Sequence, residues 1–189
     1  FIESERVIER NALQLERNLN DDYVKFFAWS ENRLQESGVG LLSMISNNVY
    51  TWSPSLRGMR AHMLNSFSSI RILNLHGASQ RGPADLRFID DENVFDIEQP
   101  VAIGTFYEAP SARGSSTGYV DITGSRTKKY QFLNQNTAPC LDHQFIVPAP
   151  PSRRFALPES DFEQEYSTFI PLNTACPLFA EGIKTGRDR

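Results

Sequence analysis

Apolar residues recur with helical spacing along residues 20–36, which predicts an amphipathic helix. Asn20 is a suitable N-cap, two aspartates follow it in the first turn, and Gly38 supplies a stop. The residues that share one face of this helix are Tyr23, Phe26, Phe27, Ser30 and Leu34.

Two apolar runs, 39–46 and 69–75, predict strands, and the first is continuous enough to be covered on both faces. Between them, Ser53-Pro54 begins a second helix, because proline is favoured at the first helical position. A strand–helix–strand unit of this length implies parallel strands with a right-handed crossover. Residues 101–107 predict a third strand, which we expect to be antiparallel to its neighbour because no crossover helix precedes it. The fold class is therefore α/β, part of a doubly wound sheet with a reversed strand at one side.

The signals beyond residue 109 are weaker. They predict a strand over 119–123, a short helix over 127–135 and a strand over 145–147. The prolines that follow indicate an extended connection, and they are Pro148, Pro150, Pro151 and Pro158. We therefore expect one region over residues 1–147 and a connection into a second region over 148–189.

The formal net charge of -4 excludes a strongly basic protein that wraps nucleic acid, yet the charges are unevenly distributed. Residues 37–82 carry no carboxylate and four arginines, whereas 83–108 carry seven acids and one base. Residues 109–135 are basic again. The acid-free stretch could face a polyanion or could be buried, and the sequence leaves these alternatives equal.

Several protein classes are excluded by what the sequence lacks. Two cysteines argue against a disulfide scaffold and fit a reducing compartment, and no apolar run could span a bilayer, so we expect a cytoplasmic protein. The three histidines lack metal-ligand spacing, and no metal is expected. No dinucleotide fingerprint, phosphate loop or nucleophile elbow occurs in the required context. The chain opens at Phe1 inside a helix-like segment, so we expect its ends to be cuts through a larger protein.

Polar residues follow the predicted parallel strands, where open α/β sheets bind their ligands. Asn47, Asn48 and Tyr50 follow the first strand, and His76 follows the second. An antiparallel third strand would begin at the same edge and bring Phe95 beside them. We expect these residues to converge, with the first three ordering a substrate or a catalytic loop. Capping explains the asparagines equally well, and a structural role is favoured for His76.

Five segments between Asp22 and Tyr107, and a short tail, carry a family resemblance. They are YVKFFAWSENRL (23–34), GVGLLSMISNNVY (38–50), LRGMRAHML (56–64), IRILNLHG (70–77), DENVFDIEQPVAIGTFY (91–107) and the tail GIKTGRD (182–188). The five resemble the second half of the catalytic domain of adenine-specific (N6) DNA methyltransferases, closest to the single-polypeptide, type I-like restriction–modification enzymes. The tail resembles the start of their target-recognition domain.

The resemblance implies a partial Rossmann-like class I methyltransferase sheet, with parallel strands and a reversed strand inserted. It implies double-stranded DNA as the partner and S-adenosylmethionine as the cofactor. It also implies that the N-terminal half of the catalytic domain is missing, since neither its glycine-rich loop nor an Asn/Asp-Pro-Pro-Tyr/Phe tetrapeptide occurs here. A recognition domain would follow downstream, and this segment would be inactive alone.

Single residues also receive roles from the resemblance. Phe95, just before the reversed strand, would stack on a flipped-out target base. The alternative is ordinary core packing, and the position of Phe95 on a loop at the strand ends favours the stacking role. Phe27, and with it Tyr23, would help to enclose the adenine of the cofactor, although core packing explains Phe27 better and Tyr23 has the same ambiguity.

Contacts with DNA have their own candidates, which are Arg57, Arg60, Arg81, Lys184, Thr185 and Arg187. A solvated helix face is the stronger explanation for each of the first three, and a flexible end explains the last three equally well. Two other functions stay open: a non-catalytic nucleic-acid or protein binding module built on a partial methyltransferase fold, and a small-molecule methyltransferase. The gene sequence upstream of Phe1 would distinguish the enzyme from the module.

Overall fold

The structure is a computed structural model. It describes residues 21–77, 90–109, 116–137, 141–157, 168–170 and 174. The chain divides into two compact units, 1–157 and 158–189, and the elements below all belong to the first. The helix-like segment before residue 20 lies outside the described residues, as do Arg81, Lys184, Thr185 and Arg187.

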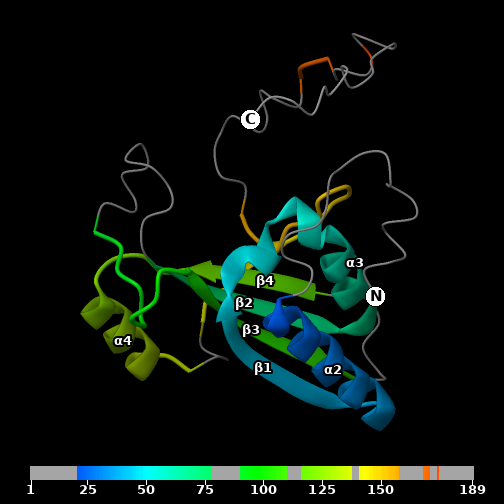
Figure 1. Cartoon of the computed structure of the whole chain (residues 1–189), viewed down its shortest axis with the longest axis horizontal. Helices are drawn as coiled ribbons and strands as arrows, with labels where there is room; N and C mark the ends of the chain where they lie inside the picture. The colour runs from blue at the N-terminus through cyan, green and yellow to red at the C-terminus, as the bar shows by residue number, and fades with distance from the viewer. Residues whose placement is uncertain are drawn as a thin grey trace, which may run out of the picture. The chain divides into compact units, whose positions relative to one another are not determined.

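A mixed five-stranded sheet forms the centre of this unit, in the order β1-β3-β2-β4-β5 (Figure 1). The strands are β1 (Gly40–Asn47), β2 (Ser69–His76), β3 (Val101–Glu108), β4 (Ser116–Asp121) and β5 (Gln144–Ile146). β3 is antiparallel to both β1 and β2, so β1 and β2 are parallel, as predicted. β4 is parallel to β2, and β5 is antiparallel to β4. The expectation that the reversed strand lies at one side is wrong, because β3 is inserted between the two parallel strands and forms a ladder with each.

The helices follow the predicted pattern with small shifts at their ends. They are α2 (Asp22–Ser37), the short 3-10 turns η1 (Asn48–Thr51) and η2 (Pro54–Leu56), α3 (Arg57–Ser66) and α4 (Arg126–Gln135). Asp21, and not Asn20, occupies the N-cap position of α2, and its side chain makes no capping hydrogen bond. It ends at Gly38, whose φ of 72° suits glycine and whose N–H bonds the Leu34 carbonyl.

The main core lies between the sheet and helices α2 and α3 (Figure 1). Phe27 of α2, Met59 of α3 and Phe106 of β3 are buried there. A second cluster lies under α4, where Phe132 packs with Leu73 and its neighbours on the opposite face of the sheet. The two clusters leave part of that opposite face uncovered among the described residues.

Strand β1 shows the effect of this arrangement. Its burial alternates, and Leu41 and Ile45 are 64% and 50% exposed. The expectation that this strand is covered on both faces is therefore wrong for the described chain, because α2 and α3 cover the same face and α4 packs further along the sheet.

The stretch after residue 147 packs against the first unit instead of leaving it. Phe155 is fully buried, and its N–H donates to the Thr51 carbonyl at 2.8 Å. The division between the two units consequently falls after Leu157. Within the described residues, no helix is long and apolar enough to cross a membrane.

Candidate functional site

The ends of β1 and β2 meet at the start of β3. Asn47 and His76 lie opposite Val101, one on each side of it. The side-chain amide of Asn48 donates to Asn74 Oδ1 at 3.1 Å. The predicted convergence of Asn47, Asn48 and His76 is therefore observed. Asn47 also caps η1 through a 2.9 Å bond from the Val49 N–H, which is the capping role left open by the sequence.

A chain of hydrogen bonds runs from Asn48 across these strand ends. Asn74 donates through Nδ2 to the Tyr119 hydroxyl at 2.8 Å, and that hydroxyl donates to Asp121 Oδ1 at 2.8 Å. Asp121 Oδ1 also lies 2.5 Å from Nε2 of His76. Asn48, Asn74, Tyr119 and His76 are buried, whereas the Asp121 side chain at the end of the chain is 41% exposed. The hydrogen bonds hold these side chains in a single arrangement.

The backbone at His76 is unusual. Its φ is +50°, in the left-handed region, and the register of β2 against β3 shifts between Asn74 and His76. Such conformations persist where surrounding contacts fix them, often at functional sites. Sequence reasoning missed Asn74, Tyr119 and Asp121. An asparagine inside an otherwise apolar strand was the available signal for the first.

Phe95 lies on the loop between β2 and β3, and its side chain is 42% exposed. Asn93 shapes this loop from within. Its Oδ1 accepts from the Phe95 N–H at 3.0 Å, and its Nδ2 donates to the carbonyls of Ile97 and Gln99 at 2.9 and 2.8 Å. The loop therefore has a defined fold although it contains no helix or strand, and it presents an aromatic ring to solvent.

A buried ion pair ties this loop to the strand ends. Lys129 Nζ of α4 lies 2.7 Å from Asp91 Oδ1, and the two side chains are 0% and 2% exposed. Asp91 also accepts from the backbone N–H groups of Gly77 and Gly124, each at 2.8 Å. These glycines follow β2 and β4, and both have positive φ angles. Lys129 belongs to residues 109–135, which the sequence shows only to be basic, and no pattern there indicates that this side chain is buried.

Two of the predicted DNA contacts lie inside the protein. Arg57 is 3% exposed and Arg60 is fully buried. Arg60 donates to the backbone carbonyls of Tyr50, Ser53, Ser152 and Arg153 at 2.5–3.0 Å. Burial and three neighbouring arginines lower the pKa of Arg60 to about 9, which leaves it charged at neutral pH. The expectation that these two side chains contact phosphates is not met, because Arg60 pins residues 152–153 to the α3 region instead.

The aromatic candidates Phe27, Tyr50 and Tyr23 belong to the core between the sheet and helices α2 and α3. The Phe27 ring is 1% exposed and lies between Tyr50 and Phe106, with ring centroids 5.2 and 5.3 Å away. Tyr50 is fully buried, so it does not line an open site. Burial raises the pKa of both the Tyr50 and the Tyr23 hydroxyl well above the ordinary value. Phe27 therefore occupies the core position that the sequence favoured as the alternative.

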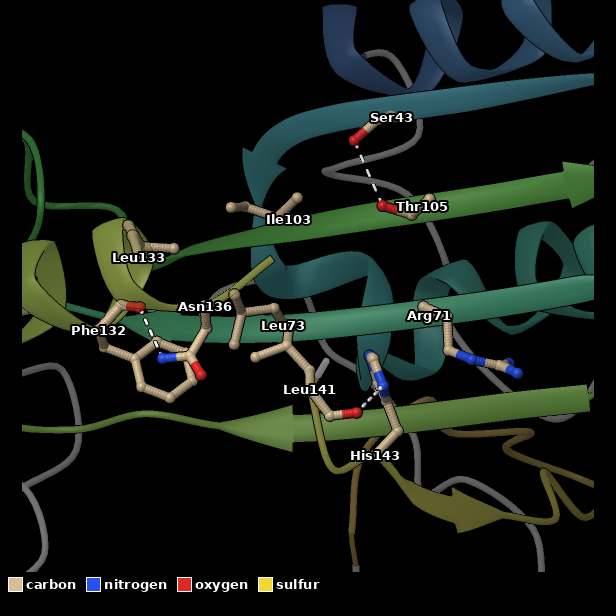
Figure 2. Close-up of a pocket in the computed structure, with 10 residues that line it drawn as sticks. All are labelled: Ser43, Arg71, Leu73, Ile103, Thr105, Phe132, Leu133, Asn136, Leu141 and His143. Atoms are coloured by element: carbon tan, nitrogen blue, oxygen red, sulfur yellow. Dashed lines mark hydrogen bonds between the residues drawn. The ribbon is translucent and has the colours of Figure 1, made fainter. Parts of the chain in front are cut away.

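A separate cavity of about 190 Å³ lies between α4 and the sheet (Figure 2). Its lining residues are Ser43, Arg71, Leu73, Ile103, Thr105, Phe132, Leu133, Asn136, Leu141 and His143. Figure 2 shows Ser43 bonded to Thr105, Asn136 to the Phe132 carbonyl and His143 to the Leu141 carbonyl. Arg71 donates to the carbonyls of Ile70 and Ser116. None of the predicted site residues lines this cavity. Among the described residues, no cluster of His, Cys, Asp and Glu could hold a metal ion.

Comparison with known proteins places the fold. No family model and no curated protein matches the chain. Among solved structures, the Type ISP restriction–modification enzyme LlaBIII bound to DNA matches with a TM-score of 0.69 and 24% identity, over 86% of this chain and 12% of that one. A nuclease-deletion mutant of the Type ISP enzyme LlaGI, in complex with a DNA substrate mimic, matches with 0.63 and 25% identity, over 70% and 11%. DrdV, in a complex with DNA, matches with 0.65 and 19% identity, over 79% and 15%.

The chain shares its fold with a segment of each. It spans 15% or less of the length of these three proteins. The comparison therefore relates the fold of this chain to one segment of each, two of which are Type ISP restriction–modification enzymes.

Proposed function

We propose that this chain is the C-terminal part of the catalytic domain of an adenine-N6 DNA methyltransferase in a restriction–modification protein. The observation that carries the proposal is Phe95, an exposed aromatic ring on an ordered loop that leads into the inserted reversed strand. The shared fold with segments of restriction–modification enzymes supports it. An enzyme that modifies a base must take it out of the duplex, and an aromatic face replaces part of the stacking that the base loses.

In this proposal the Phe95 ring stacks on the extruded adenine. Asn48 and the hydrogen-bonded side chains at the strand ends form the rigid surface next to it. S-adenosylmethionine is the cofactor that the proposal requires. Phe27 does not line an open site for it, because other rings enclose its side chain. We therefore assign the cofactor loop and the tetrapeptide that grips the adenine to sequence upstream of this chain. The proposed upstream half of the sheet would pair with the outer edge of β1.

The binding-module alternative loses support from the structure. It relied on the basic segments, and Arg57, Arg60 and Lys129 are buried. Downstream, the DNA sequence would be chosen by a recognition domain, for which Lys184, Thr185 and Arg187 stay candidates near the junction.

The test uses the intact protein that the gene encodes, with radiolabelled S-adenosylmethionine and unmodified double-stranded DNA, followed by mass spectrometry of the nucleosides. We expect N6-methyladenine. Phe95→Ala should lower the rate about 5- to 150-fold, the range that loss of base–aromatic stacking gives, while Phe95→Trp keeps most of it. Phe145→Ala, at an exposed ring on β5, is the matched control. DNA binding without any methylated adenine would favour the binding module, and full activity of Phe95→Ala would remove the role of Phe95.

A further inference from the structure

Helix α4 contacts the Phe95 loop in an unusually regular way. The backbone carbonyls of four consecutive residues, from Glu92 to Phe95, each accept a hydrogen bond from an α4 side chain. Lys129 Nζ donates to the Glu92 carbonyl at 2.5 Å, and the Tyr130 hydroxyl donates to the Val94 carbonyl at 2.7 Å. The remaining two carbonyls are bonded by a single arginine.

That arginine is Arg126, in the first turn of α4. Its Nε donates to the Asn93 carbonyl at 2.7 Å, and a terminal nitrogen donates to the Phe95 carbonyl at 3.2 Å. The other terminal nitrogen lies 2.8 Å from the Asp96 carboxylate. The Arg126 backbone N–H donates to the Glu92 side chain at 2.7 Å. One residue thus spans the loop from Glu92 to Asp96.

Loop carbonyls on a protein surface are ordinarily satisfied by water, which leaves the backbone free to move. Here they are satisfied by side chains of a helix that is itself tied to the strand ends through Asp91 and Lys129. The Phe95 ring, by contrast, keeps 42% of its surface exposed. The arrangement fixes the backbone of the loop and leaves the ring available.

We infer that Arg126, Lys129 and Tyr130 are positioning residues that hold Phe95 ready for an unstacked base. The inference rests on the proposed function. It gives α4 a role that neither its basic composition nor its short length indicated. A stacking surface contributes most when it is already in place, because the ordering of the loop then costs nothing at the moment of binding.

The first measurement does not depend on activity. Hydrogen exchange of the loop amides, residues 90–100, is compared between the wild type and Tyr130→Phe, which removes only the hydroxyl. We expect exchange about 2- to 10-fold faster, the effect of losing one hydrogen bond. Arg126→Met should give a larger increase. Tyr107→Phe is the matched control, since Tyr107 is 42% exposed on β3 and the carbonyls of Glu92 to Phe95 are bonded by α4 side chains instead. Unchanged exchange in both α4 variants would overturn the inference.

The second measurement is methyl transfer by the intact protein. For Tyr130→Phe and Arg126→Met we expect kcat to fall at least about 5-fold with the KM for DNA within about 2-fold, because misplacement of a positioned group lowers turnover. A variant that merely folds less completely would contain a smaller fraction of active protein. Hydrogen exchange of the loop amides in its folded molecules would then stay at the wild-type rate. Faster exchange with wild-type kcat would overturn the positioning role. If Phe95→Ala is fully active, the proposed function of Phe95 fails, and that result is seen separately from the exchange data.

Discussion

Replacing Lys129 with methionine removes one half of a fully buried ion pair while keeping most of the side-chain volume. Asp91 would then keep two backbone N–H partners, from Gly77 and Gly124, but would lose its counter-charge in a position where its side chain is 2% exposed. The Glu92 carbonyl would lose its donor as well. Breaking a buried pair from one side costs about 3–5 kcal/mol, because it leaves an uncompensated charge.

Thermal and urea unfolding of the chain measure this loss. For a protein of this size, about 3–5 kcal/mol corresponds to a Tm lower by about 6–20 °C. Lys128→Met is the matched control, since the neighbouring Lys128 side chain is exposed and its Nζ donates to the Thr123 carbonyl, and its cost should stay within about 0.5–1 kcal/mol.

The double variant Asp91→Asn/Lys129→Met decides the cause. A neutral amide at position 91 removes the stranded charge, so the double variant should regain about 2 kcal/mol or more of the loss. The argument from a stranded charge is refuted if Lys129→Met unfolds no more easily than Lys128→Met. It is also refuted if the stability losses of the single variants Asp91→Asn and Lys129→Met simply add in the double variant.

Three further predictions concern other parts of the unit. Arg60→Met leaves four backbone carbonyls without their donor and should cost at least about 3 kcal/mol in urea unfolding; a loss below about 1 kcal/mol would show that water replaces the guanidinium. Gly77→Ala should cost more than Gly38→Ala in thermal unfolding, because both have positive φ but only at Gly77 would the new Cβ meet a neighbour, Asn93, at 2.6 Å; equal costs would contradict this. Burial, against smaller opposing effects of Ser66 and His62, raises the pKa of the Glu31 carboxyl above its ordinary 4.5. The folded state therefore holds this proton more tightly, and the stability it contributes is complete below pH 4.5 and lost as the pH rises through the raised pKa. Glu31→Gln should flatten that decline in urea titrations at a series of pH values, and an equally steep decline would count against it.

The helices and strands could be predicted because each depends on a local pattern of apolar and polar residues. The apolar runs at 39–46 and 69–75 and the spacing along 20–36 mark strands and a helix within one or two residues of their observed bounds. The place of β3 could not be predicted in this way. Insertion between two strands depends on which strand edges are free in the folded sheet, and the spacing of apolar residues along the sequence carries no information about those edges.

The same distinction between local patterns and distant contacts holds for the residues of the candidate site. Asn47, Asn48 and His76 could be found because strand direction alone decides where they lie. Asn74 and Lys129 could not, because their polar atoms are buried with partners that are distant in sequence. Arg60 illustrates the opposite error, since an arginine in an acid-free stretch resembles a phosphate ligand until its carbonyl partners are known.

The insertion of β3 also determines when the sheet can form during translation. β1 and β2 leave the ribosome before the strand that separates them, and neither forms a ladder with the other in the final sheet. Both must wait until residues 101–108 emerge, and only then do the two halves of the strand–helix–strand unit become one sheet. A nascent chain that stops short of residue 100 would therefore expose two strands that have no partner on either edge, so this region should depend more on chaperones during translation than its short length indicates.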